Sequence, residues 1–183
     1  MKYVLIVGGA IVLVALTVLV VGLLLPVTHQ AAREATYRAA PADLYALITD
    51  VKAFPEWRPT VQKVEVLPPL NGHSQFREIG NNGSILYEID SASPNRLLVT
   101  RIADRSLPFG GKWTYEVIPN SDSTTLRITE DGEVYNPIFR FVSRFVFGHS
   151  ATIEEYLRDV GRRFGQSTGV RTPRSGASII SRI

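Results

Sequence analysis

The chain of 183 residues contains no cysteine. It therefore has no disulfide framework, no thiolate ligand for a metal ion and no cysteine nucleophile. The absence of cysteine does not distinguish a reducing compartment from an oxidising one, so localisation has to be argued from other features of the sequence.

Excess charge of either sign is small as well, because 20 Lys and Arg face 17 Asp and Glu for a net charge of +3. Much of the positive excess lies near the C-terminus, where Arg171, Arg174 and Arg182 have no acidic neighbour. A nucleic-acid-binding domain carries a denser basic patch than this. We therefore expect no nucleic-acid partner.

The sequence lacks recognisable motifs for metal, nucleotide or triad chemistry. Its histidines are scattered through the chain: His29, His73 and His149. Gly8-Gly9 falls inside an apolar run, and Gly110-Gly111 falls in a turn between predicted strands rather than between a strand and a helix. We expect no metal site and no cofactor, and we assign no catalytic residue.

What the sequence does have is one long apolar run, from Tyr3 to Val27, without a single charged residue. As a helix it would reach roughly 37 Å, enough to cross a hydrocarbon core of about 30 Å. A cleaved signal peptide and a buried soluble helix are the alternatives, but the run is long for the first and apolar all round for the second. We predict an uncleaved single-pass anchor over residues 1–29, with a slight bias of the flanking charges toward an extracytoplasmic domain.

The middle of the chain reads as a series of short strands. After a first strand at Gln30–Tyr37, further strands are predicted at Val61–Leu67, Ser74–Gly80, Ser84–Ala92, Arg96–Ala103, Lys112–Ile118 and Thr124–Val134. Turn residues such as Asn-Asn-Gly and Pro-Asn-Ser-Asp separate them. Such short connections indicate an antiparallel meander.

Helical patterns flank these strands. Ala40-Pro41-Ala42-Asp43 begins a short helix, with proline in its first turn and aspartate at its positive end. The two prolines of residues 50–59 predict a helical turn followed by an ordered loop. Residues 138–147 form a further helical stretch, and a long C-terminal helix carries apolar residues at helical spacing: Ile153, Tyr156, Leu157, Val160 and Phe164.

The order of elements predicts an α+β domain over residues 30–165, with its helix on one face of a twisted antiparallel sheet. Such a sheet does not close perfectly on the helix, so an apolar cavity can remain between them. Residues 166–183 are rich in Ser, Gly, Thr and Arg, and we expect them to be a disordered tail.

Four segments in this order are informative: the opening APADLYALITD of residues 40–50, the FPEWRP of residues 54–59, the WTYEV of residues 113–117 and the closing Glu155-Tyr156-Leu157. Together they resemble the superfamily of START domains, birch-pollen allergens and polyketide cyclases/dehydrases. The resemblance implies a helix-grip fold: a seven-stranded antiparallel sheet curled around a long C-terminal helix and a hydrophobic pocket. It also implies binding, transport or sensing more often than catalysis.

Strand alternation suggests which residues line that pocket. If Trp113 and Tyr115 face inward, then Leu126, Ile128 and Glu130 form the matching row on the next strand. An inward Glu130 needs a partner, for which we consider Arg77, Arg101 and Tyr87. The alternatives are that the apolar residues are ordinary core and that a bulge at Asp131-Gly132 turns Glu130 outward.

Phe54 and Trp57 belong to the loop that contains the two prolines. They could form a lid at the cavity mouth, or they could be an ordinary hydrophobic plug that packs the loop onto the domain. Tyr156 of the last helix completes the expected ligand-binding set: Phe54, Trp57, Tyr87, Arg101, Trp113, Tyr115, Leu126, Ile128, Glu130 and Tyr156. Arg140 with Arg144, and Arg158 with Arg162, stand one turn apart and could meet anionic headgroups or simply form a solvated face.

The favoured functional hypothesis is a membrane-anchored binding or carrier domain for a hydrophobic small molecule such as a lipid, isoprenoid, quinone or polyketide. One alternative is an enzyme similar to polyketide cyclases or aromatases, in which Glu130, Arg101 and Tyr87 guide proton transfer. The other is a membrane-tethered interaction module that uses its arginine-rich helix or tail. The membrane contact is expected through residues 3–27, and the sequence identifies no protein partner.

Overall fold

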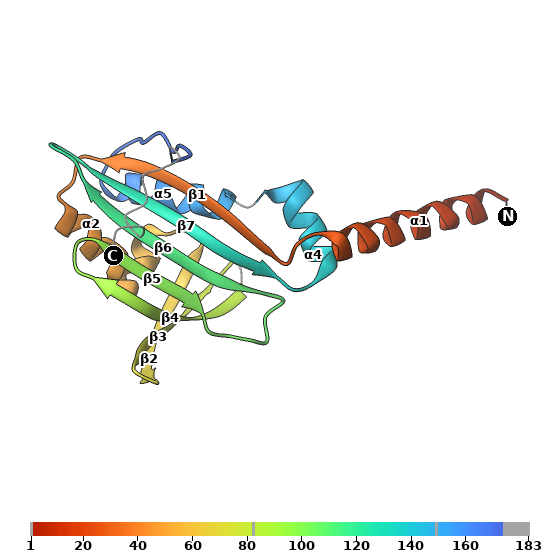
Figure 1. The fold of residues 1–183 in the computed structure, drawn as a ribbon, viewed down its shortest axis with the longest axis horizontal. Helices are drawn as coiled ribbons and strands as arrows, with labels where there is room; N and C mark the ends of the chain where they lie inside the picture. The colour runs from red at the N-terminus through yellow and green to blue at the C-terminus, as the bar shows by residue number, and fades with distance from the viewer. Residues whose placement is uncertain (1, 82, 149, 174–183) are drawn as a thin grey trace.

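The fold of this computed structural model is one curved antiparallel sheet that holds a C-terminal helix in its concave face, with a long helix projecting from one end (Figure 1). The structure describes residues 2–81, 83–148 and 150–173, with residues 146 and 147 described by their backbone alone. The predicted α+β helix-grip architecture is thereby confirmed.

The projecting element is α1 (Lys2–Leu24), a helix whose side chains are largely exposed along its length. It is long and apolar enough to cross a bilayer, although the same length and composition also occur in signal sequences. Figure 1 shows it extending away from the rest of the chain, so its apolar surface takes no part in the domain core.

The sheet contains seven strands in the order β1-β7-β6-β5-β4-β3-β2, each antiparallel to its neighbours. The strands are β1 (Thr28–Tyr37), β2 (Val61–Leu70), β3 (His73–Gly80), β4 (Gly83–Ser93), β5 (Leu97–Ile102), β6 (Phe109–Pro119) and β7 (Thr124–Val134). All seven predicted strands are present, and six of them follow one another as a meander. The first strand, β1, pairs with the last strand, β7, and forms one edge of the sheet.

Short helices connect β1 to β2 and close the sheet at one end. They are α2 (Pro41–Thr49), the 3₁₀ turn η1 (Val51–Ala53) and α3 (Phe54–Trp57). Pro41 stands at the start of α2, where its missing N–H costs nothing. The buried residues of α2 are Leu44 and Ile48, which lie one turn apart and join the core.

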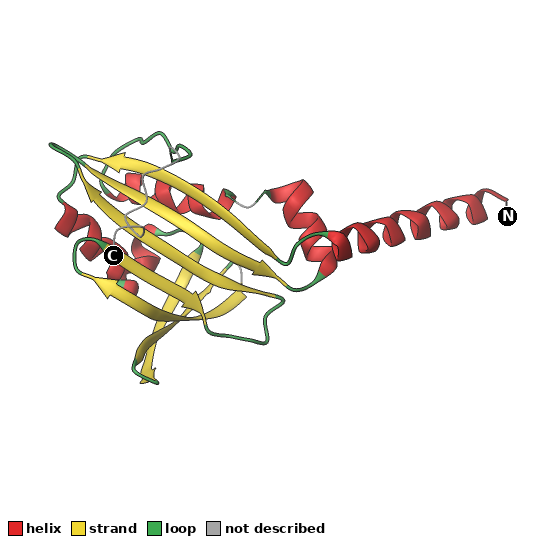
Figure 2. Ribbon diagram, in the orientation of Figure 1, coloured by secondary structure: helices red, strands yellow, loops and turns green. Residues whose placement is uncertain are grey.

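The C-terminal helix α5 (Ala151–Arg163) fills the concave face of the sheet. Figure 2 shows it as the helix behind the strands. Its side chains Ile153, Leu157 and Val160 are fully buried, as the spacing predicted. The hydroxyl of Tyr37 on β1 donates a hydrogen bond of 2.7 Å to the carbonyl of Leu157, which fixes the helix against the edge of the sheet.

Between β7 and α5 the chain forms α4 (Pro137–Val142) and a π-helical turn, η2 (Ser143–Phe147). Asn136 caps α4, because its side-chain oxygen accepts hydrogen bonds from the backbone N–H groups of Ile138 and Phe139. Helix α4 packs against the end of α1 rather than against the core of the domain, and none of its residues is fully buried.

The first part of the expected tail has a defined position. The backbone of Arg171 exchanges two hydrogen bonds of 2.9 Å with Glu34 of β1, and the Arg171 guanidinium also contacts the Glu34 carboxylate. Gln166 bonds to the backbone of Arg38. Two residues of the expected tail, Gln166 and Arg171, therefore have hydrogen-bond partners in or next to the edge strand β1. Residues 174–183 of the expected tail lie outside the described part of the chain.

Candidate ligand-binding site

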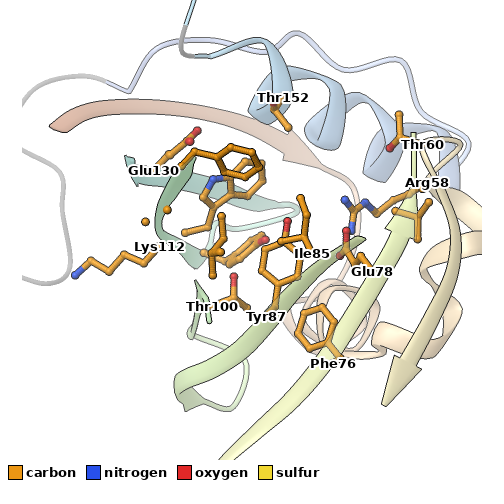
Figure 3. Close-up of a pocket in the computed structure, with 18 of the residues that line it drawn as sticks. Arg58, Thr60, Phe76, Glu78, Ile85, Tyr87, Thr100, Lys112, Glu130 and Thr152 are labelled. Atoms are coloured by element: carbon orange, nitrogen blue, oxygen red, sulfur yellow. The ribbon is translucent and has the colours of Figure 1, made fainter. Parts of the chain in front are cut away.

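A cavity of about 590 Å³ lies between the concave face of the sheet and the helices. Its walls are mainly apolar and aromatic, with contributions from Leu98 and Trp113. Figure 3 shows three further wall residues, Phe76, Ile85 and Tyr87. Small-molecule sites in proteins have this size and this mixture of apolar walls with few polar groups. The cavity exists because the curled sheet and the helices do not fill the space between them.

One end of the cavity holds a buried ion pair. The Arg58 guanidinium donates a hydrogen bond of 2.6 Å to the carboxylate of Glu78, and both side chains are about 15% exposed. Arg58 also lies over the rings of Phe54, at 4.9 Å, and Tyr156, at 5.0 Å. The nearby Glu78 carboxylate raises the pKa of Arg58 against the opposing effect of burial, so this arginine stays charged.

The other end of the cavity holds Glu130, on the same face of β7 as Leu126 and Ile128. Burial raises the pKa of its carboxyl to about 7, against a smaller opposing effect from its hydrogen bond with Trp113. The Nε2 atom of His29 lies 3.7 Å from the Glu130 carboxylate. A carboxyl group in this environment changes its charge near neutral pH.

Gly132 leaves space for the side chains of His29 and Glu130. A Cβ atom at Gly132 would lie 2.3 Å from the His29 ring and 3.1 Å from the Glu130 carboxylate. His29 pairs with Gly132 across β1 and β7, so the imidazole occupies the space that a side chain at position 132 would need. Gly132 therefore accommodates the His29 ring. A β-bulge at Asp131-Gly132 was the alternative that would turn Glu130 outward, but β7 pairs in regular register with β1 and β6 through Glu130.

Five of the predicted site residues line the cavity: Phe54, Tyr87, Trp113, Tyr115 and Glu130. Tyr87 and Tyr115 are deeply buried, which raises the pKa of each phenol and keeps both neutral. The inward direction of Glu130 follows from strand alternation.

The other five predicted residues do not line it. Leu126 and Ile128 are fully buried core, as the alternative interpretation held. Trp57 and Tyr156 pack edge-to-face with ring centroids 5.4 Å apart, behind the cavity wall. Trp57 and Phe54 are both buried, so they act as an internal plug rather than an exposed lid.

Arg101 faces away from the cavity. Its neighbours Thr100 and Ile102 both line the cavity, so strand alternation turns Arg101 to the opposite face, where it is half exposed and pairs with Glu88. The same rule turns Arg77 outward between Phe76 and Glu78. Neither arginine is the partner that we expected for Glu130, whose contacts are Trp113 and His29.

The Arg58–Glu78 pair was not predicted from the sequence. Arg58 belongs to the motif that carried the family resemblance, but nothing in that motif shows that its side chain points into the domain. In β3, polar and apolar residues do not alternate regularly, so no pattern identified Glu78 as inward. The two side chains meet only in the tertiary structure, where the Arg58 guanidinium lies 2.6 Å from the Glu78 carboxylate.

The arginine pairs of the last helices largely have partners within the chain. Arg158 lies 3.8 Å from Glu154, and Arg162 pairs with Asp159. Arg140 donates a hydrogen bond of 2.8 Å to the carbonyl of Leu25 at the end of α1. In the part of the chain that the structure describes, no three His, Asp or Glu side chains could together hold a metal ion.

Residues 28–164 match the family model described as polyketide cyclase / dehydrase and lipid transport. The chain belongs to this family. The match covers the whole sheet and both α2 and α5, and it leaves α1 outside, so the projecting helix is an addition to the family domain in this chain.

Solved structures with the same fold include members of this superfamily with different activities. A START superfamily protein from Mycobacterium smegmatis is 19% identical, with a TM-score of 0.60 over 75% of this chain and 97% of its own. The Zhui aromatase/cyclase from Streptomyces sp. R1128 is 16% identical, with a TM-score of 0.57 over 73% and 91%.

Norcoclaurine synthase from Thalictrum flavum, in complex with dopamine and hydroxybenzaldehyde, is 13% identical, with a TM-score of 0.60 over 75% and 86% of the two chains. No curated protein matches the chain. At these identities the likenesses establish the fold alone, and the function has to be argued from the site.

Proposed function

We propose that this family member is a membrane-anchored binding or carrier domain for a hydrophobic small molecule. The observation that carries the proposal is the cavity of about 590 Å³, whose walls are mostly apolar and aromatic and contain few charged groups. Burial of an apolar ligand in such a space is favourable by roughly 25 cal/mol per Å² of surface removed from water.

The anchor in this proposal is α1. Its exposed leucine, isoleucine and valine side chains would be costly to leave in water over 23 residues, and a bilayer is the surrounding that accepts them. A lipophile dissolved in that bilayer would then be close to the cavity. The flanking charges predict that the domain lies on the extracytoplasmic side, which labelling of a single introduced cysteine with a membrane-impermeant maleimide on intact cells would test.

Native mass spectrometry of the full chain, extracted from its source membrane, is the direct test of binding. We expect a reproducible lipophilic adduct that is lost in Ile85→Trp, because a Trp side chain at this cavity wall occupies ligand space. Val66→Trp is the matched control, since Val66 is an exposed apolar strand residue away from the cavity. A clean mass for the unsubstituted chain would argue against the carrier.

A second candidate is an enzyme of the cyclase or aromatase kind, and one observation favours it. Glu130 titrates near neutral pH inside an apolar cavity, which suits a general acid or base. Fewer residues than expected could take part in proton transfer, because Arg101 lies outside the cavity and burial keeps the Tyr87 phenol neutral. If Glu130→Gln abolished turnover of a polyketide-like substrate while the ligand still bound, the enzyme would replace the carrier as the preferred function.

A further inference from the structure

The structure brings an exposed apolar helix and part of the cavity wall together at one place, beside the end of α1. We propose that residues 137–147, the segment formed by α4 and η2, lie in the bilayer interface and form the passage by which a lipophile moves between the membrane and the cavity. This inference rests on the proposed function, because it requires that α1 spans a bilayer and that the cavity binds a lipophile.

Two contacts fix α4 next to the end of α1. Gly22 lies so close to α4 that a Cβ atom there would come within 2.0 Å of the carbonyl oxygen of Pro137. The Arg140 guanidinium donates a hydrogen bond to the carbonyl of Leu25, one residue after α1 ends. If α1 spans the bilayer, these contacts hold α4 at the level where the chain leaves the hydrocarbon core.

The segment and Tyr135, two residues before it, present large apolar side chains to the outside. Tyr135 is 47% exposed, Ile138 52%, Phe139 53% and Phe145 60%. Exposed apolar side chains on a short helix beside a membrane span are typical of a segment in the interface, where aromatic rings are favoured. Arg144 on the same segment is exposed and carries the positive charge that lipid phosphates attract.

The cavity reaches this same segment. Phe139 and Ser143 line it from α4 and η2, Pro108 lines it from the turn between β5 and β6, and Phe109 lines it from the start of β6. Phe139 is thus both half exposed and part of the cavity wall. A lipophile that passes this residue would move from the apolar surface into the cavity without crossing bulk water.

The segment can move at low cost. None of residues 137–145 is fully buried, and the π-helical turn that follows α4 ends at Gly148, whose φ of 71° breaks the helix before α5. Elements with few buried contacts open with low free energy. Movement of residues 137–147 would open a passage while α5 stays in the core.

Depth in the membrane can be measured with single-cysteine variants, because the chain has no natural cysteine. Bimane would be attached to Leu13→Cys in α1, Phe145→Cys in η2 and Ser121→Cys in the turn at the far end of β7, with the full chain in phosphatidylcholine nanodiscs. Doxyl-labelled phosphatidylcholine should quench the labels at positions 13 and 145 and leave the label at position 121 bright.

The three labels separate the two proposals. Quenching at position 13 without quenching at position 145 would overturn the interfacial position of residues 137–147 and leave the anchor intact. A bright label at position 13 would overturn the anchor, and with it this inference.

Passage can be tested by the rate at which N-phenyl-1-naphthylamine, dissolved in the bilayer, reaches the cavity and accepts energy from Trp113. The variant Ile138→Asp/Phe145→Asp changes two exposed residues that do not line the cavity. We expect its loading rate to fall about tenfold, because two charges oppose insertion into the interface. Its equilibrium affinity for the probe in detergent should be unchanged.

The matched control is Val66→Asp/Leu70→Asp, which places the same charges on residues that are 53% and 56% exposed in β2, on the hairpin distant from α1 in Figure 1. This control should load at the normal rate. Equal loading rates for both variants would overturn the passage. If the unsubstituted chain took up no probe, the proposed binding function would fail first.

Discussion

The two ends of the cavity contain the same chemical group in opposite electrostatic situations. Glu78 forms a 2.6 Å ion pair with Arg58, beneath the rings of Phe54 and Tyr156. Glu130 has an indole donor and a nearby imidazole, and its pKa is raised to about 7. An ion pair therefore marks the end near α3, and a carboxyl group whose pKa is raised to about 7 marks the end near β1 and α1.

The difference shows two ways in which the fold accommodates a buried carboxylate: by pairing it with a cation, or by letting it take up a proton. A compensated pair is costly to break, since removal of one partner leaves a buried charge. A carboxyl group with neutral donors can instead release its charge by taking up a proton. We expect the first end to support the structure and the second to respond to pH or to a ligand.

The largest effect should come from breaking the ion pair. Arg58→Met leaves Glu78 without its cation and should lower the free energy of unfolding by about 3–5 kcal/mol. Urea unfolding of the full chain in detergent, followed by Trp57 and Trp113 fluorescence, measures this change. The double variant Arg58→Met/Glu78→Leu should recover much of the loss, and failure to recover would show that the ring contacts of Arg58 matter more than its charge.

The next effect concerns the pH dependence of stability. The folded-state pKa of Glu130 is raised above its unfolded value, so the folded protein holds the proton more tightly. Stability from this residue is therefore full below the unfolded pKa of about 4.5 and falls by up to about 3 kcal/mol as the pH rises to about 7.

Glu130→Gln removes this titration. The free energy of unfolding should then change less between pH 4.5 and pH 7 than in the unsubstituted chain, as measured by urea titrations across this range. Glu155→Gln, an exposed residue of α5, is the control and should keep the original pH dependence. An unchanged slope in Glu130→Gln would show that Glu130 is ionised throughout, which would remove the contrast between the two ends.

A smaller effect is expected where α1 meets the domain. Gly22→Ala places a methyl group against the Pro137 carbonyl and should weaken the packing of α4 on α1 by about 1–3 kcal/mol. Proteolysis within residues 137–148 of the full chain in nanodiscs would report this loosening. Gly9→Ala has open space around its Cβ position and should leave the proteolysis rate unchanged.

The smallest effect should come from Arg101→Met, on the outer face of β5. Its half-exposed pair with Glu88 contributes about 0–1 kcal/mol to stability. Ligand retention in native mass spectra should not change, because the side chain points away from the cavity. Loss of the ligand in this variant would contradict the outward orientation and return Arg101 to the site.

Local patterns predicted most of the fold. Strand and turn signals located all seven strands, and the spacing of Ile153, Leu157 and Val160 placed the buried face of α5. Strand alternation also placed Trp113, Tyr115 and Glu130 on the cavity side. Arg101 was predicted in the site for its charge. The structure places its neighbours Thr100 and Ile102 in the cavity wall, so the same alternation turns Arg101 to the outer face.

The sequence by itself determined the apolar helix, the meander and the amphipathic last helix, because each depends on residues that are neighbours in the chain. Only the tertiary structure decided the rest. The Arg58–Glu78 pair, the space for His29 beside Gly132, and the contact of α4 with α1 each join residues that are distant in sequence. Periodicity carries no information about such pairs, since they depend on how the sheet curves and where the helices meet it.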